Sequence, residues 1–175
     1  MKKYIALLRG INVSGKNKIL MKDLQLLFEK LNFENIKTYI QSGNVVFENP
    51  TETCNVLAQK IETALKITFD IDVPVLILEK IQLEKILSEA PKEKNGEEIY
   101  FTILEKKASK EAIIDCQNKA PKTADYFEVK ENVVYVFCKN GYGKTKLTNT
   151  FFEKKLNVKA TTRNRNTLET LLEML

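Results

Sequence analysis

The segment from Gly10 to Asn17 is the first stretch of this sequence whose residue types suit anion binding. It reads GINVSGKN and matches the spacing of a Walker A phosphate loop up to its last position, where Asn17 replaces the Ser or Thr that binds magnesium. A nucleotide-hydrolysing loop also needs a parallel sheet and an acidic strand end, which the surrounding pattern does not indicate. The weaker prediction is a nest of backbone N–H groups beside Lys16 that binds an anion without hydrolysis. Glycines that serve only the turns of a long loop are the alternative.

Arginine is rare in this chain, and its positions suggest a specific use. Of the 28 basic residues, 25 are Lys and only three are Arg, namely Arg9, Arg163 and Arg165. Each lies in a short polar segment beside Gly or Asn, at the edge of an expected secondary-structure element. The planar guanidinium group forms paired hydrogen bonds with carboxylates and phosphates that an ammonium group cannot form. These positions therefore indicate anion binding, with a buried ion pair to an Asp as the alternative.

A second basic, glycine-containing segment lies near the C-terminus. Residues 139–146 read KNGYGKTK between an expected strand and an expected helix, without the Walker spacing. Residues 161–167 read TTRNRNT and come directly before the last helix. If both segments lie at one end of a sheet, they offer cations, a flexible backbone and a helix N-terminus to a phosphate group. The residues expected to bind there are Lys144, Arg163, Asn164 and Arg165.

Several kinds of chemistry are excluded by composition. The sequence contains no histidine, which excludes His-based triads, His general bases and His metal ligands. The three cysteines, Cys54, Cys116 and Cys138, are far apart and lack C-x-x-C spacing, so we predict free thiols without a metal. No pair of carboxylates is specified for acid–base catalysis. We therefore predict that the protein uses no metal and no cofactor.

Composition and charge indicate a globular protein. The chain has 175 residues, of which 43% are hydrophobic and 29% are charged. Its net charge of +5 indicates either a mild preference for anionic partners or only a lysine-rich surface. No apolar run approaches the roughly 18 residues of a membrane helix. The run Tyr4 to Leu8 is also too short for the core of a signal peptide. The prediction is a cytoplasmic protein without membrane association, and the oligomeric state is not indicated.

Hydrophobic periodicity predicts the same series of elements twice along the chain, in the order strand, helix, strand, strand, helix, strand. A helix over 81–87 and a charged stretch at 91–96 separate the two series, and a final helix covers 168–175. Asn166 and Glu169 have the spacing of a capping box at its start. The expected strands are 3–8, 36–40, 45–47, 73–78, 99–104, 126–129, 133–138 and 158–162, and the expected helices are 21–31, 57–65, 109–118 and 147–156.

With right-handed crossovers, this order predicts an α+β fold of two small ferredoxin-like βαββαβ units with antiparallel sheets, plus a C-terminal helix. The predicted domains are 1–79 and 98–175, joined by a helix and linker at 80–97. In each unit the end of the first strand and the hairpin turn lie at one end of the sheet. We therefore expect Arg9, Asn12 and Lys16 to face Gln41, Ser42 and Asn44, with Gly15 as a further residue of the predicted anion site. Asp70 or Asp72 is an alternative ionic partner for Arg9.

Three segments resemble a known bacterial family. They are residues 4–17 (YIALLRGINVSGKN), 38–47 (TYIQSGNVVF) and 161–164 (TTRN), and they resemble the family designated domain of unknown function 1697 (DUF1697). The resemblance covers nearly the whole chain. It implies a compact protein of ferredoxin-like units, without an established activity or known catalytic residues. Two residues differ from the family pattern, Ser14 in place of the usual Gly and Arg165 in place of the usual Trp. The signature positions are Arg9, Asn12, Gly15, Lys16, Gln41, Ser42, Gly43, Asn44, Arg163 and Asn164.

The leading functional hypothesis is a protein that binds a phosphate-bearing ligand, either a nucleotide or single-stranded RNA, through its Arg and Gly-Lys segments. RNA has weaker support because most aromatic residues occupy expected core positions. One alternative is an enzyme acting on a small anionic substrate, with Lys16 or Lys144 forming a Schiff base. The other alternative is a protein-interaction module whose loops dock a partner.

Overall fold

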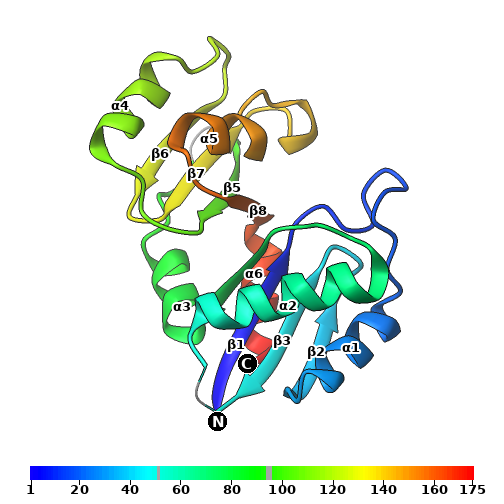
Figure 1. Ribbon diagram of the computed structural model, residues 1–175. Coiled ribbons are helices and arrows are strands. Elements are labelled where there is room, and N and C mark those ends of the chain that lie inside the picture. Colours follow the sequence, from blue (N-terminus) through cyan, green and yellow to red (C-terminus); the bar gives the residue numbers. More distant parts are fainter. Residues whose placement is uncertain (51, 94–95) are drawn as a thin grey trace. The chain divides into compact units, whose positions relative to one another are not determined.

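The computed structural model describes residues 1–50, 52–93 and 96–175 and contains two four-stranded antiparallel sheets with helices between their strands (Figure 1). The chain divides into two compact units, Met1–Lys85 together with Glu169–Leu175, and Ile86–Leu168. The predicted α+β fold of two small ferredoxin-like units is confirmed. Residues 169–175, predicted in the second domain, group with the first unit, and the predicted connecting helix is divided between the two units after Lys85.

The first unit has the predicted order of strands and helices. Its elements are β1 (Lys2–Leu8), α1 (Met21–Lys30), β2 (Glu34–Tyr39), β3 (Asn44–Asn49), α2 (Cys54–Phe69) and β4 (Val75–Glu79). The strands lie in the order β2-β3-β1-β4, and each neighbouring pair is antiparallel. This is the order that right-handed crossovers produce in a ferredoxin-like unit.

Strand β1 is buried on both of its faces, since all residues from Tyr4 to Leu8 are fully buried. Successive side chains of a strand point to opposite faces. Tyr4 therefore belongs to the core under α1 and α2, where its ring stacks on Phe47 with 5.7 Å between the centroids. Helix α2 contributes an apolar stripe to this core, formed by Leu57, Ile61 and Leu65. A sheet with two buried faces needs a second layer, which the C-terminal helix supplies.

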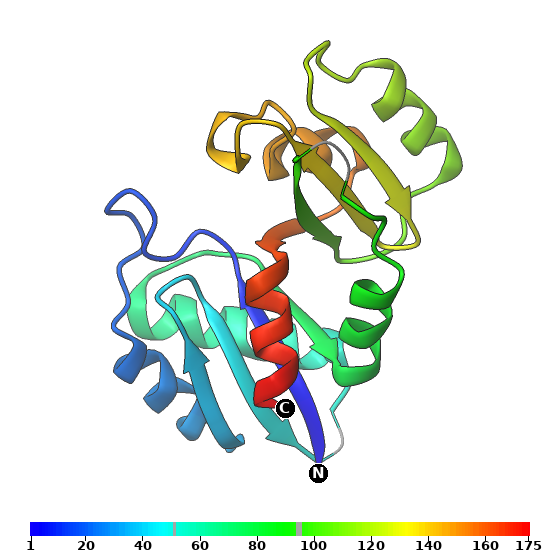
Figure 2. The ribbon, with the colours of Figure 1, turned by 180° about the vertical axis from the view of Figure 1, so that it is seen from behind.

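Helix α6 (Arg165–Met174) begins in the second unit and ends in the first. Its last turns lie across the face of the first sheet opposite α1 and α2 (Figure 2). Lys3 Nζ donates to the carbonyl oxygen of Leu175, and Lys37 Nζ donates to that of Met174 at 3.5 Å. These bonds hold the end of α6 against two strands of the sheet.

The predicted capping box at the start of this last helix is wrong. The helix begins at Arg165, so Asn166 lies inside its first turn. The cap is Asn164, whose Oδ1 accepts a hydrogen bond from the backbone N–H of Thr167 at 2.9 Å. Asn is as good a helix cap as Ser or Asp, and the sequence TTRNRNT offers two of them. The local spacing favoured Asn166 as the cap, whereas the structure uses Asn164.

The second unit repeats the topology, with strand order β6-β7-β5-β8 and antiparallel neighbours throughout. Helix α3 (Lys80–Ser88) links the two series of elements, as predicted for 81–87. Within the described parts of the chain, no helix is long and apolar enough to cross a membrane. The elements of the unit are β5 (Glu98–Leu104), α4 (Lys110–Asn118), β6 (Tyr126–Lys130), β7 (Val133–Cys138), the 3-10 turn η1 (Tyr142–Lys144), α5 (Asn149–Leu156) and β8 (Ala160–Asn164).

The turn between β2 and β3 is tightly packed against the end of β1. The carbonyl oxygen of Gly43 accepts a hydrogen bond from the backbone N–H of Leu8 at 2.8 Å. Gly43 has a φ of +76°, and a Cβ added there would lie 2.7 Å from the Cβ of Leu8. Only glycine fits this conformation and this distance. The close approach brings the hairpin turn beside the loop that follows β1, as the topology predicted.

Candidate functional site

The loop between β1 and α1 folds back on itself as a small, well-defined hairpin. Val13 and Lys16 form an isolated antiparallel bridge, and the Lys16 N–H donates to the Val13 carbonyl oxygen at 2.9 Å. The two residues between them, Ser14 and Gly15, have φ values of +50° and +75°. Positive φ at both central residues is the requirement of a tight two-residue hairpin turn. The Gly10–Asn17 segment is therefore an ordered hairpin rather than a P-loop.

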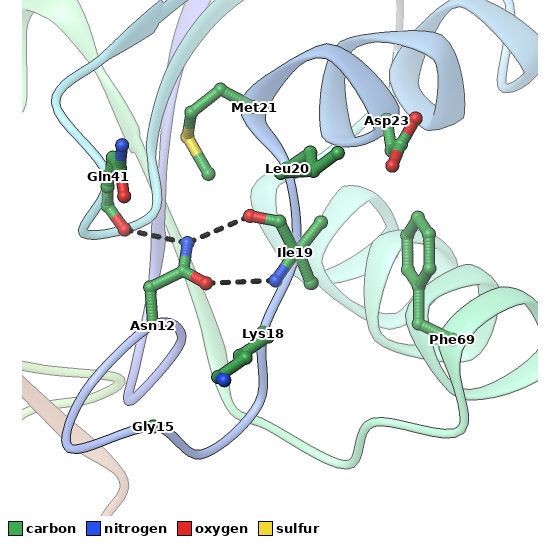
Figure 3. A pocket seen from close by; sticks show the side chains of 9 residues that line it. All are labelled: Asn12, Gly15, Lys18, Ile19, Leu20, Met21, Asp23, Gln41 and Phe69. Carbon is green, nitrogen blue, oxygen red and sulfur yellow. Dashed lines mark hydrogen bonds between the residues drawn. The ribbon is translucent and has the colours of Figure 1, made fainter.

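Asn12 holds this hairpin in place through its side-chain amide. Its Nδ2 donates to the carbonyl oxygens of Ile19 at 2.9 Å and Gln41 at 3.0 Å, and its Oδ1 accepts from the Ile19 N–H at 2.9 Å (Figure 3). The expected proximity of Asn12 to the β2–β3 turn is thus observed. Because both amide donors are already used, Asn12 positions the loop rather than offering donors to a ligand.

A cavity of about 550 Å³ lies beside this loop and the start of α1, and we call it the α1 cavity (Figure 3). Its lining combines a cation, a carboxylate and two amides with an apolar wall. The lining residues are Asn12, Gly15, Lys18, Ile19, Leu20, Met21, Asp23, Gln41 and Phe69.

Helix α1 begins at this cavity without a side-chain cap. Its N-cap residue is Leu20, which forms no capping hydrogen bond because it has no side-chain acceptor. The first N–H groups of a helix have no partner within the helix, and together they carry a partial positive charge. Lys18 adds a full positive charge to the same cavity. The helix start and Lys18 each favour an anion, whereas the first turn of α1 also carries the Asp23 carboxylate.

The charged side chains of the α1 cavity lie at two different ends of it. Figure 3 shows Lys18 on the side of the loop and Asp23 beside Phe69, on the side of the two helices. Across residues 1–50, 52–93 and 96–175, no hydrogen bond or ion pair joins the side chain of Lys18 or Asp23 to another part of the protein. The cavity thus offers one cationic end and one anionic end to a ligand.

Only part of the site predicted in the first unit lines this cavity. Asn12, Gly15 and Gln41 belong to the lining, whereas Arg9, Lys16, Ser42 and Asn44 do not. Asn44 is fully buried, and its Nδ2 donates to Ser42 Oγ at 2.8 Å and to the Tyr39 carbonyl oxygen at 3.2 Å. Its amide therefore closes the hairpin turn.

The remaining residues predicted near this end of the sheet have other surroundings. Arg9 is half-buried at the end of β1, where its backbone N–H donates to the Pro74 carbonyl oxygen at 3.0 Å. Lys16 is exposed on the loop. Asp70, one of the carboxylates considered as a partner of Arg9, pairs with Lys66 at 2.7 Å. The hydrogen bond from Lys66 holds the pKa of the Asp70 carboxyl below its ordinary value.

Three lining residues that give the cavity its charge and its aromatic wall were not predicted from the sequence, namely Lys18, Asp23 and Phe69. The sequence contained one signal that pointed to the region of Lys18 and Asp23. The helix between them begins after Leu20, so it lacks the usual Ser, Thr, Asp or Asn at its N-cap. No comparable signal marks Phe69, since it lies at the end of α2 and reaches the cavity only through the packing of the unit.

In the second unit, the segment 139–146 lies over one face of β8. The Tyr142 hydroxyl donates to Thr162 Oγ1 at 3.1 Å, and Thr162 Oγ1 donates to Asn149 Oδ1 at 2.7 Å. Lys144, at the end of the η1 turn, is exposed. Thr162 thus marks the face of β8 that carries the basic, glycine-containing segment.

The arginines of the second unit belong to the other face of β8. Arg163 Nη1 donates to Thr161 Oγ1 at 2.9 Å, and the Arg165 guanidinium carbon lies 5.3 Å from the ring centroid of Phe101. Residues adjacent in a strand point to opposite faces, so Arg163 points away from Thr162. Desolvation lowers the pKa of Arg163 to about 10. The structure therefore does not bring Lys144 and the two arginines together on one face.

A smaller cavity of about 280 Å³ lies near the start of α6, with Asn164 and Arg165 in its lining. Glu93 and Glu98 line it too, and Arg165 Nε lies 3.6 Å from Glu93 Oε1. Asn164 already caps α6 through its Oδ1. With two carboxylates in its wall, this cavity is less suited to a phosphate group than the α1 cavity.

The described residues contain no group of three or more His, Cys, Asp or Glu side chains placed to hold a metal ion. Cys116 and Cys138 are fully buried, and desolvation raises the pKa of each thiol to about 11. Cys54 is half-buried, and burial raises its pKa too. Raised pKa values disfavour the thiolate that nucleophilic cysteine chemistry requires.

The two buried thiols predict a loss of stability in alkaline solution. In the unfolded chain they lose their protons near pH 9, whereas in the folded protein they keep them up to about pH 11. The unfolded state therefore binds fewer protons in this window, and we expect the free energy of unfolding to fall by roughly 1 kcal/mol per thiol for each pH unit above 9. Urea denaturation between pH 8 and pH 10.5 measures this slope. The double variant with Cys116→Ala and Cys138→Ala should show a shallower slope, and an unchanged slope would contradict the assignment.

Comparisons with known proteins agree with this architecture. The profile of the family described as protein of unknown function (DUF1697) matches residues 1–135. The structure is similar to that of the conserved bacterial protein SP0830 from Streptococcus pneumoniae, with a TM-score of 0.77, 21% sequence identity, and coverage of 99% of this chain and 98% of that chain. No curated protein matches the sequence. At this identity the structural similarity shows a shared fold, and the profile match over most of the chain shows the family. This chain belongs to the DUF1697 family.

Proposed function

We propose that this protein binds a phosphate-bearing small molecule of the nucleotide class in the α1 cavity. The observation that carries the proposal is the uncapped N-terminus of α1, which opens into a cavity that also holds Lys18. Backbone N–H groups of a helix start and an ammonium group form a common type of phosphate site. The phosphate binds at the end of the cavity formed by Gly15 and Lys18, away from Asp23, which lies in the first turn of α1.

The rigidity of the loop supports this site. Asn12 closes the segment from residue 12 to residue 19 with two hydrogen bonds to the backbone of Ile19. Asn17 adds a third bond, from its Nδ2 to the Gly10 carbonyl oxygen at 3.0 Å. A loop that is already ordered loses little conformational entropy when a ligand binds.

A single nucleotide suits the cavity better than a strand of RNA. A cavity of about 550 Å³ lies within the usual size range for small-molecule sites, and its apolar residues can contact a base. Proteins that bind single strands present several exposed aromatic rings on which bases stack. Among the described residues, Tyr126 is the most exposed aromatic residue, at 37%, and its ring already stacks on Phe137 with 4.4 Å between centroids.

Binding is better supported than catalysis. The two lysines considered as Schiff-base residues, Lys16 and Lys144, are exposed and lie outside the α1 cavity. Reactive lysines are usually desolvated in an apolar pocket or placed beside another cation. The cavity contains one carboxylate, Asp23, and therefore no carboxylate pair for acid–base chemistry.

Lys18→Ala is expected to weaken nucleotide binding about 10-fold to 100-fold, because a hydrogen bond to a charged group contributes about 1.5–3 kcal/mol. Lys16→Ala is the matched control, since it removes the same charge from the same loop but outside the cavity. Isothermal titration calorimetry with a panel of nucleoside mono-, di- and triphosphates measures both affinities. Equal losses in the two variants would indicate only general charge attraction, and no binding by any nucleotide at millimolar concentration would reject the proposal.

A further inference from the structure

We infer that the α1 cavity selects guanine nucleotides, with the Asp23 carboxylate reading the base and Phe69 lying against it. This inference rests on the proposed function, because it assigns the second end of the same cavity. The first end, with Lys18, accounts for a phosphate group but leaves the carboxylate at the other end unexplained.

The position of Asp23 restricts the kind of ligand that fits. A carboxylate in the same cavity repels any ligand that carries only negative charge. A ligand suited to both ends therefore has an anionic group at Lys18 and hydrogen-bond donors at Asp23. Nucleotides with a donor-rich base have this character, whereas inorganic phosphate and simple phosphorylated acids do not.

Phe69 identifies the donor group as part of a flat ring. Its side chain lies beside Asp23 in the cavity, and it is only half-buried although it packs on the core of the unit (Figure 3). Leu20, whose side chain is 72% exposed, lies in the same part of the cavity wall. Aromatic and aliphatic side chains next to a polar group form the usual contacts of a purine base in a pocket.

The four bases differ in the hydrogen-bond donors and acceptors that they present to a carboxylate. The Watson–Crick edge of guanine presents two adjacent donors, N1–H and the 2-amino group, which match the two oxygens of a carboxylate. In adenine and cytosine the amino group has a ring nitrogen acceptor beside it, which faces the second carboxylate oxygen and repels it. Uracil presents one N–H between two carbonyl oxygens. A carboxylate therefore favours guanine over the other three bases.

Asp23 also occupies the third position of α1, where a carboxylate stabilises the helix start. That role alone requires a negative charge near the first turn, and it makes no distinction between bases. The two roles are therefore separable by substitutions that keep the helix and change only what Asp23 presents to a base.

The test compares GMP, IMP, AMP and XMP by calorimetry on the full chain. The variant is Asp23→Asn, and the control is Glu29→Gln, which removes a carboxylate from the same helix outside the cavity. The wild-type protein should bind GMP at least tenfold more tightly than AMP, and IMP more weakly than GMP because it lacks the 2-amino donor. Asp23→Asn should weaken GMP at least tenfold, leave AMP within about twofold and strengthen XMP, whose 2-oxo group accepts from the new amide.

The outcomes separate this inference from the proposed function. Glu29→Gln should leave all four affinities unchanged, and thermal melts of both variants check that the fold is retained. If GMP and AMP bind equally and both depend on Lys18, guanine selection is wrong and nucleotide binding stands. The inference also fails if Asp23→Asn leaves the ratio of GMP to AMP affinity unchanged. If no nucleotide binds, both proposals fail.

Discussion

Gly43→Ala is expected to lower the free energy of unfolding by about 2–5 kcal/mol, the sum of a left-handed conformation at a non-glycine residue and an overpacked contact. Gly43 has a φ of +76°, and an added Cβ would meet the Leu8 Cβ at 2.7 Å and the Leu8 carbonyl oxygen at 2.9 Å. The backbone oxygen cannot move aside without disturbing β1. Urea denaturation monitored by circular dichroism measures the change.

Gly10→Ala is the matched control for this prediction. Gly10 has nearly the same φ, +73°, but an added Cβ there meets nothing within 4 Å. Gly10→Ala should therefore lower the free energy of unfolding only by the cost of the left-handed conformation, about 1–2 kcal/mol. Equal losses in the two variants would show that the contact with Leu8 contributes nothing, which would contradict the close packing of the turn against β1.

Asn12→Ala is expected to lower the free energy of unfolding by about 2–4 kcal/mol, because it leaves the backbone N–H and carbonyl groups of the buried Ile19 without hydrogen-bond partners and places Ala at a left-handed position. The variant removes three hydrogen bonds of 2.9–3.0 Å, two of them to Ile19, whose side chain is only 5% exposed. The same urea experiment measures the loss. Nucleotide affinity should fall too, because the loop is no longer held at the cavity.

Asn17→Ala is the control that separates two contributions to the stability lost in Asn12→Ala, the hydrogen bonds of the side chain and the left-handed backbone conformation. Asn17 has a similar φ, +47° against +55° for Asn12, but within the described part of the chain its side chain forms a single hydrogen bond, to the Gly10 carbonyl oxygen, and the residue is exposed. We expect a loss of about 1–2 kcal/mol, mostly from the left-handed backbone. A loss as large as that of Asn12→Ala would show that conformation rather than the Asn12 bonds holds the loop.

Much of the fold was predictable because it follows from local periodicity and from the chirality of crossovers. Alternating and helical patterns placed the strands and helices within a few residues, and the βαββαβ order then led to the observed strand order. The sequence did not indicate that residues 169–175 group with the first unit, because an amphipathic helix shows that it has an apolar face but not which sheet the face covers.

The candidate site was predictable only where it depends on topology. The pairing of Asn12 with the β2–β3 turn followed from the strand order, because chain segments at one end of a sheet must meet. Lys16, predicted to bind the anion, lies outside the lining of the α1 cavity, and Lys18, two residues further along the same loop, belongs to it. Phe69 and Asp23 line the cavity from two different helices, and the spacing of residues along the chain does not predict that they lie in the same cavity.

The sequence by itself determined the fold class, the family, the absence of histidine chemistry and the position of the loops that carry polar residues. These properties depend on composition, on short-range patterns and on motifs contained within single segments. The tertiary structure alone decided which side chains share a cavity and which asparagines close turns. It also decided that the arginines of the second unit and its basic segment lie on opposite faces of β8. The physical reason is that side-chain direction depends on φ values and on packing between distant segments, and neither is encoded in the spacing of residue types along the chain.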